Sequence, residues 1–285
     1  MTASRAMTLP KIGIMQGRLS PPVGGRIQAF PAATWHAEFE LAAKLGLASI
    51  EWIVESPLPS NPLMTAAGAA DVRTVVQRTG VAVDFVIADY FMESPFVRMS
   101  ASTAEHNRTV LATLLEHAAK LGARGVEIPC VDASEIRTRA EEDELASALA
   151  PALAQAERLG VELGLETSLP PERFRALLER IGHPRIRANY DTGNSASLGY
   201  DPAEEFAAYG PWINNVHIKD RRHGGGTVPL GQGDTNIPRV LKLLSGIPYR
   251  GDYILQAARG PDEIETVRSY LLQVRGWLGA IAAQR

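Results

Sequence analysis

Short apolar runs alternate along this chain with longer segments in which apolar residues recur at helical spacing. Runs of this kind, bounded by Gly, Pro or Asn, are typical of strands buried in a parallel sheet. The longer segments are typical of helices that cover such a sheet. The predicted strands are 11–15, 49–54, 82–88, 125–128, 161–166, 186–191, 213–219 and 252–256. The predicted helices are 34–45, 65–79, 103–121, 141–159, 170–181, 202–208, 237–244 and 262–278.

Start and stop signals support several of these helices. Thr34 precedes the first of them as a cap, and Gly46, Gly122 and Gly160 follow three of them at positions where a left-handed residue ends a helix. The pattern amounts to eight strand-helix units, which predicts a single (β/α)₈ TIM barrel over residues 1–285. A doubly wound open sheet is the alternative. It is disfavoured because no GxGxxG turn follows the first strand.

Four consecutive strands in the second half of the chain end in polar residues of the kind that bind metal: Glu166, Asp191, His217 and Gln256. Burying a carboxylate or an imidazole without a partner costs several kcal/mol, by order of magnitude, in folding free energy. Side chains alternate along a strand, so all four can face the barrel interior together. A divalent ion at the carboxyl ends of the strands would satisfy them, and active sites of TIM barrels lie at that end.

Composition limits the remaining possibilities. A chain of 285 residues with 45% hydrophobic residues and a net charge of −3 is an ordinary globular chain without general attraction for nucleic acid or anionic lipid. The single cysteine, Cys130, excludes an intrachain disulfide and suits a reducing compartment. No run of about 18 apolar residues occurs, and the first ten residues lack the core of a signal peptide. We therefore expect a cytoplasmic protein.

Four motifs carry a family resemblance that spans residues 12–260. They are Gly-Ile-Met-Gln-Gly-Arg-Leu (13–19), Leu-Gly-Leu-Glu-Thr (163–167), Tyr-Asp-Thr-Gly-Asn (190–194) and Val-His-Ile-Lys-Asp (216–220). With them, the chain resembles the sugar phosphate isomerase/epimerase branch of the xylose isomerase-like TIM barrels. That resemblance implies one divalent ion held by Glu, Asp, His and Glu, with the two glutamates moving protons beside the sugar carbonyl. Mn²⁺, Co²⁺, Mg²⁺ or Fe²⁺ suits such a ligand set.

The match holds at Glu166, Asp191 and His217 and departs at the fourth position, where this chain has Gln256. A carboxamide can bind a metal through its oxygen, but it cannot accept a proton as a base. Glu166 is then the expected base, and Lys219 or a water is the candidate for the opposite face of the substrate. The expected substrate contacts are Arg18, Glu51, Asn189, Lys219 and Arg259.

Three function classes follow from these residues. The first is a metal-dependent isomerase or epimerase of a small carbohydrate or its phosphate. The second is a lyase or dehydratase at the same site, and the third is a sugar-binding barrel that lost its chemistry with Gln256. Endonuclease-like relatives need more histidine ligands and a basic groove, and the six histidines and acidic net charge disfavour a nucleic-acid partner. A homo-oligomer is compatible with the sequence.

Overall fold

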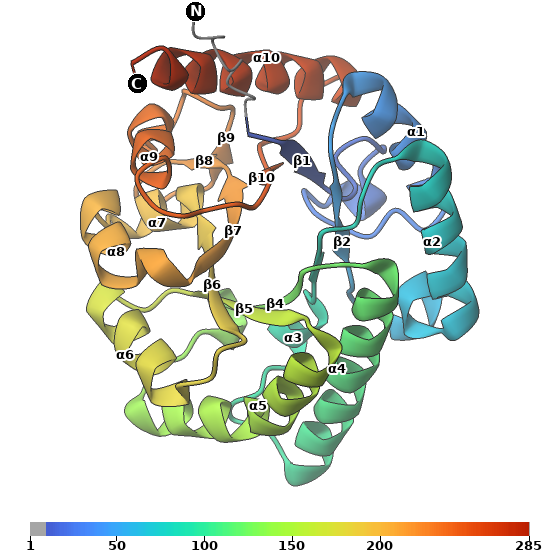
Figure 1. Cartoon of the computed structure of the whole chain (residues 1–285), viewed down its shortest axis with the longest axis vertical. Coiled ribbons are helices and arrows are strands. Elements are labelled where there is room, and N and C mark those ends of the chain that lie inside the picture. Colours follow the sequence, from blue (N-terminus) through green and yellow to red (C-terminus); the bar gives the residue numbers. More distant parts are fainter. Residues whose placement is uncertain (1–9, 285) are drawn as a thin grey trace, which may run out of the picture.

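The barrel prediction is confirmed in the computed structural model, which describes residues 10–284. Eight parallel strands close in the order β1-β10-β7-β6-β5-β4-β3-β2, and helices surround them (Figure 1). The strands are β1 (Ile12–Met15), β2 (Ile50–Ile53), β3 (Phe85–Ile87), β4 (Gly125–Cys130), β5 (Glu162–Thr167), β6 (Ile186–Asp191), β7 (Ile213–Ile218) and β10 (Tyr253–Leu255).

The outer ring consists of amphipathic helices whose apolar faces pack on the strands. These helices are α1 (Trp35–Leu45), α2 (Ala66–Thr79), α4 (Ala101–Leu121), α5 (Arg139–Leu159), α6 (Pro171–Ile181), α8 (Pro202–Tyr209), α9 (Ile237–Leu244) and α10 (Glu263–Ala282). Gly46, Gly122 and Gly160 end α1, α4 and α5 in the left-handed conformation, as expected from the sequence. Their backbone N–H groups close the last helical turns.

Five strands, β1, β2, β3, β7 and β10, are shorter than the sequence pattern predicts, and β3 and β10 illustrate this. The third begins at Phe85 and the last ends at Leu255. The residues on either side are still mostly buried, because they continue the interior without the regular ladder. Apolar runs therefore predict burial more accurately than they predict strand ends.

Several small elements lie over the carboxyl ends of the strands, where the sequence predicts only loops. They are α3 (Tyr90–Glu93), α7 (Thr192–Leu198), the hairpin β8 (Asp220–Arg221) with β9 (Thr227–Val228), and short 3₁₀ turns at Val23–Gly25, Leu58–Ser60, Pro62–Met64 and Asp132–Ser134. A further 3₁₀ turn, Gly210–Trp212, lies directly before β7 at the amino end of that strand. The buried carboxylate of Asp220 holds the hairpin region in place by accepting hydrogen bonds from the backbone of Gly231, Gly233 and Thr235. Between residues 10 and 284, no helix is long and apolar enough to cross a membrane.

Barrel closure depends on tight packing between β1 and its two neighbours. Gly13 of β1 pairs with Ile254 of β10, and Ser49, just before β2, hydrogen-bonds Asp252 at 2.6 Å. A Cβ on Gly13 would meet the Ser49 hydroxyl and would lie 2.7 Å from Ile254 Cδ1. Only a glycine fits at this seam.

We expect Gly13→Ala to lower the free energy of unfolding by about 1–3 kcal/mol, because overpacking of a closed core forces neighbours off their rotamers. Urea denaturation at constant metal concentration measures the effect. Gly276→Ala is the matched control, since Gly276 lies exposed within α10 and a Cβ there meets nothing within 4 Å. This control should gain about 0.5–1 kcal/mol from helix propensity. Equal stability of Gly13→Ala and the unmodified chain would contradict the packing argument.

Candidate active site

His217 lies at the centre of a polar cluster inside the barrel. It comes from β7 and is fully buried. Its Nε2 lies 2.9 Å from Glu51 Oε2, and its Nδ1 lies 3.9 Å from both Glu166 Oε2 and Asp191 Oδ2. The two ring nitrogens therefore face two different carboxylate groups, one deep in the barrel and one toward the mouth.

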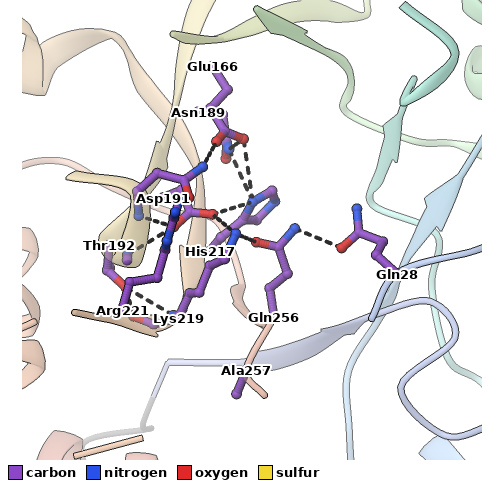
Figure 2. A network of polar contacts seen from close by, with 12 residues as sticks. Gln28, Glu166, Asn189, Asp191, Thr192, His217, Lys219, Arg221, Gln256 and Ala257 are labelled. Carbon is purple, nitrogen blue, oxygen red and sulfur yellow. Dashed lines mark hydrogen bonds and ion pairs between the residues drawn. The ribbon is translucent and has the colours of Figure 1, made fainter. Parts of the chain in front are cut away.

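The group toward the mouth contains the sequence-predicted residues Glu166 and Asp191. Asn189, on β6, donates to Glu166 at 3.1 Å and lies 3.2 Å from His217 Nδ1 (Figure 2). Asn194 donates to the second oxygen of Glu166. Both oxygens of Glu166 are thus oriented by amides, which fixes the plane of its carboxylate.

Asp191 has two roles in the fold, because it ends β6 and also caps α7. Its Oδ1 accepts hydrogen bonds from the backbone of Gly193 and Asn194 at 2.9 and 2.8 Å. Its Oδ2 faces the Lys219 ammonium at 3.1 Å. Burial opposes the charge on Asp191, but Lys219 and His217 outweigh it and hold the pKa of this carboxyl below its usual value. Asp191 is therefore an anion in the folded protein.

Gln256 directly follows β10 and lies beside Lys219 in the cluster. Its Oε1 accepts from Lys219 Nζ at 3.3 Å, and its Nε2 donates to Gln28 Oε1 at 2.9 Å. Gln28 in turn donates to Asp89 Oδ2 at 2.8 Å. A chain of polar contacts thus runs from Asp191 to Asp89 through side chains of the β7, β10 and β1 ends, and Figure 2 shows its middle part.

The deep group contains Glu51, Glu127 and Asn215, none of which lines the cavity at the barrel mouth. Glu51 was expected to contact substrate, but its side chain is fully buried and bonds His217 and Asn215 instead. Burial raises the pKa of Glu127 well above its usual value, which favours a neutral carboxyl there. Burial alone would lower the pKa of His217, but the neighbouring Glu127 and Glu51 outweigh burial and hold this pKa well above its usual value.

Two arginines with predicted substrate roles hold loops in place. The Arg18 guanidinium donates to the backbone carbonyls of Ala257 and Ile27 at 3.1 and 2.5 Å. Arg259 donates to the carbonyls of Ile27, Ser20 and Gly17 at 2.7–3.0 Å. Burial, followed by repulsion from Arg259, lowers the pKa of Arg18 to about 10. Arg18 lines the mouth cavity, whereas Arg259 does not.

A cavity of about 610 Å³ opens above the cluster at the carboxyl ends of the strands. Its wall includes Glu166, Lys219 and Gln256, together with Asp89 and Asn194. A volume of this size accommodates a small sugar or sugar phosphate. The candidate base therefore faces a space that a carbohydrate can occupy.

The residues present fit one divalent ion. Ligand atoms of Glu166, Asp191 and His217 all lie within 4.8 Å of one another, and all three side chains are buried. Two carboxylates and one imidazole suit Mn²⁺, Co²⁺, Mg²⁺ or Fe²⁺ better than a structural zinc. The Nε2 contact to Glu51 supports this arrangement, because a metal-binding histidine commonly donates its other N–H to a carboxylate.

Glu51, Glu127 and His217 form a second group with the same spacing. Hydrogen bonds from Asn215 and Asn189 already occupy these carboxyl groups. Together with the raised pKa of Glu127, this favours neutralisation by a proton. The group at the mouth is therefore the better candidate for a metal site.

Comparison with known proteins places this arrangement in a family. The family model for the xylose isomerase-like TIM barrel matches residues 39–273. The chain belongs to this family. A 2-epi-5-epi-valiolone 7-phosphate 2-epimerase from Actinoplanes sp. is 28% identical over 240 residues, which cover 84% of this chain and 83% of that protein.

Two solved structures share the fold at low sequence identity. A D-psicose 3-epimerase determined in the presence of D-fructose is 17% identical, with a TM-score of 0.75, covering 94% of this chain and 99% of that one. A xylose isomerase-like TIM barrel protein from Mycobacterium smegmatis, in complex with magnesium, is 20% identical with a TM-score of 0.69, covering 96% and 98%. These likenesses agree with the barrel described above.

Sequence reasoning missed Glu127, Asp89, Gln28 and Asn194. Glu127 carries a signal that the strand pattern could have supplied, since it is a carboxylate between apolar residues of a buried strand, as Glu51 is. The other three lie on loops or on α7, and only the folded loops bring them to the mouth.

We expect His217→Ala to abolish binding of Mn²⁺, because it removes one ligand and leaves two buried carboxylates without their imidazole neighbour. Isothermal titration calorimetry measures the affinity, and circular dichroism checks the fold. The control is His223→Ala, which changes an exposed histidine of the hairpin region. Undiminished Mn²⁺ affinity in His217→Ala would show that the ion binds elsewhere.

Proposed function

We propose that this protein is a metal-dependent epimerase of a small carbohydrate or its phosphate, with Glu166 as the base. The observation that supports this most directly is the position of Glu166. Its carboxylate belongs to the metal-ligand group and also forms part of the cavity wall. The relative from Actinoplanes sp. carries the name of a sugar-like phosphate epimerase, which favours epimerisation over other proton abstractions.

In this proposal Glu166 removes the proton from the carbon beside the substrate carbonyl. Hydrogen bonds from Asn189 and Asn194 fix the direction of its carboxylate before the substrate binds. A divalent ion bound by Glu166, Asp191 and His217 would polarise the carbonyl and stabilise the negative charge that develops on its oxygen.

Lys219 contributes positive charge at the same wall. Its ammonium is only 15% exposed and lies between Asp191 and Gln256. A cation held there stabilises an enediolate oxygen without any rearrangement of the protein. Because Lys219 is already paired with Asp191, we assign it to this electrostatic role rather than to proton transfer.

The presence of Gln256 is compatible with a mechanism in which Glu166 is the only metal-ligand carboxylate that acts as a base. As an amide it has no acid-base function, and both of its polar atoms are occupied by Lys219 and Gln28. A lyase or dehydratase would use the same abstraction and then lose a β-leaving group. Detection of a dehydrated product, rather than an epimer, distinguishes that alternative.

The test uses a panel of D-fructose, D-psicose and their 6-phosphates, with Mn²⁺, Mg²⁺ or Co²⁺. NMR in D₂O follows both the interconversion of epimers and the entry of deuterium beside the carbonyl. We expect Glu166→Gln to reduce interconversion by about 10²–10⁴-fold, since a carboxamide cannot provide the positioned proton transfer. Glu93→Gln is the control, because Glu93 is an exposed acid on the wall of the same cavity.

Undiminished interconversion in Glu166→Gln would mean that another group is the base. If the unmodified enzyme neither interconverts nor exchanges any member of the panel, the result favours a sugar-binding barrel without this chemistry. Metal affinity measured in parallel distinguishes loss of the base from loss of the ion.

A further inference from the structure

An epimerase must act on both faces of one carbon. After proton removal the carbon is planar, and inversion requires a proton donor on the face that the first base does not reach. In the function proposed above, on which this inference rests, Glu166 transfers the proton on one face of that carbon. This donor is either a water or a second acid-base side chain on the same cavity.

Most charged side chains on the cavity wall are unsuited to this task. Arginines stay protonated. Glu55 accepts a two-point ion pair from Arg26, at 2.6 and 3.0 Å, and also a hydrogen bond from the backbone of Phe30. Glu93 and Asp132 are exposed at the rim, and Lys219 is paired with Asp191. Among the described residues of the wall, this elimination leaves Asp89 beside Glu166.

Asp89 follows β3, and Glu166 lies on β5, so one strand separates them around the barrel. Both line the same cavity, and a sugar bound there can contact both. Asp89 Oδ2 accepts a hydrogen bond from Gln28 at 2.8 Å. Its Oδ1 is shielded from solvent and has no hydrogen-bond partner within the described part of the chain. A negative charge on a buried carboxylate oxygen without a partner costs more free energy than a neutral carboxyl in the same place.

We propose that Asp89 is the second catalytic acid-base residue and exchanges a proton with the face of the substrate carbon that Glu166 does not reach. Gln28 positions the Asp89 carboxyl, and Gln256 positions Gln28 through the hydrogen bond between the two amides. The glutamine at the end of β10 thereby supports the base instead of acting as one.

The ionisation of Asp89 is consistent with this role. Burial, with smaller contributions from the carboxylates of Glu55 and Glu166, raises the pKa of Asp89, whereas the hydrogen bond from Gln28 and the charge of His217 lower it, and the net result is a pKa of about 7. Near neutral pH, both the acid and the anion are therefore populated, as a group that both gives and takes a proton requires. The charged groups that face Asp89 are Arg18, Arg26, Glu55, Glu93, Glu166 and His217.

The proposed step conserves atoms and charge. The C–H bond beside the carbonyl breaks, its proton goes to the Glu166 carboxylate, and its electron pair forms the enediolate. The enediolate then takes the proton of the neutral Asp89 carboxyl on the opposite face, which forms the inverted C–H bond and leaves Asp89 as a carboxylate. No atom is oxidised or reduced, and proton exchange with water returns both acids to their starting states. The reverse reaction uses the two residues in exchanged roles.

Asp89→Asn tests this assignment, because asparagine keeps an oxygen that can accept from Gln28 but cannot transfer a proton. With the epimer pair that the unmodified enzyme interconverts, we expect interconversion to fall by about 10²–10⁴-fold. The epimer whose proton faces Glu166 should still exchange it with D₂O, while the other epimer should not. Glu166→Gln should show the mirror-image pattern. Asp71→Asn, which changes an exposed acid of α2 outside the cavity wall, is the control and should keep both exchanges.

The pattern of exchange distinguishes catalysis from a structural role, since misfolding or a distorted cavity slows both epimers alike. Gln28→Met provides a second variant. We expect it to reduce proton exchange less than Asp89→Asn does, and only in the epimer whose proton faces Asp89. Two results would overturn the assignment and leave the proposed function intact. One is equal proton exchange of both epimers in Asp89→Asn, and the other is exchange of only one epimer in Lys219→Met in place of Asp89→Asn. If the unmodified enzyme acts on no member of the panel, the proposed function fails, and the assignment of Asp89 fails with it.

Discussion

The burial of several carboxyl groups around one imidazole is the constraint on which the rest of this structure depends. Glu51, Glu127, Glu166 and Asp191 all point into the barrel around His217. Four negative charges in such a space would repel one another and lose their hydration, at a cost of several kcal/mol each by order of magnitude. The chain compensates with His217, with amide donors from Asn189 and Asn215, and with a neutral Glu127. A divalent ion at the mouth would complete this compensation.

The strand-end residues could be predicted from the sequence for a physical reason. Side chains alternate along a strand, and parallel strands in a closed barrel bring their carboxyl ends to one rim. A polar residue that ends a buried apolar run must therefore meet the others, and Glu166, Asp191, His217 and Gln256 do lie together at this rim. Asp89 and Gln28 are different. Their positions depend on the paths of two loops, which periodicity does not encode, and their contact joins residues 61 positions apart.

The roles expected for charged loop residues were the least predictable part of the site. An arginine near a barrel mouth suggests an anionic substrate, yet Arg18 and Arg259 donate to backbone carbonyls of the loops that follow β1 and β10. Such carbonyls have no strand partners, and a guanidinium with five donors can satisfy several of them at once. The sequence contains no signal that distinguishes an arginine used in this way from one that awaits a ligand.

Gln256 shows how one amide changes the distribution of charge at the mouth. An amide accepts on one side and donates on the other, so it connects the Lys219 ammonium to Gln28 and leaves the Gln28 amide free to donate to Asp89. A carboxylate at this position has no donor. It would accept from Lys219 and attract the Gln28 amide, so Asp89 would lose its hydrogen bond, and a further negative charge would lie beside Asp191. Because Gln256 is neutral, Lys219 remains available to neutralise Asp191. The other carboxyl group of the cavity wall is then that of Asp89, on the β3 side.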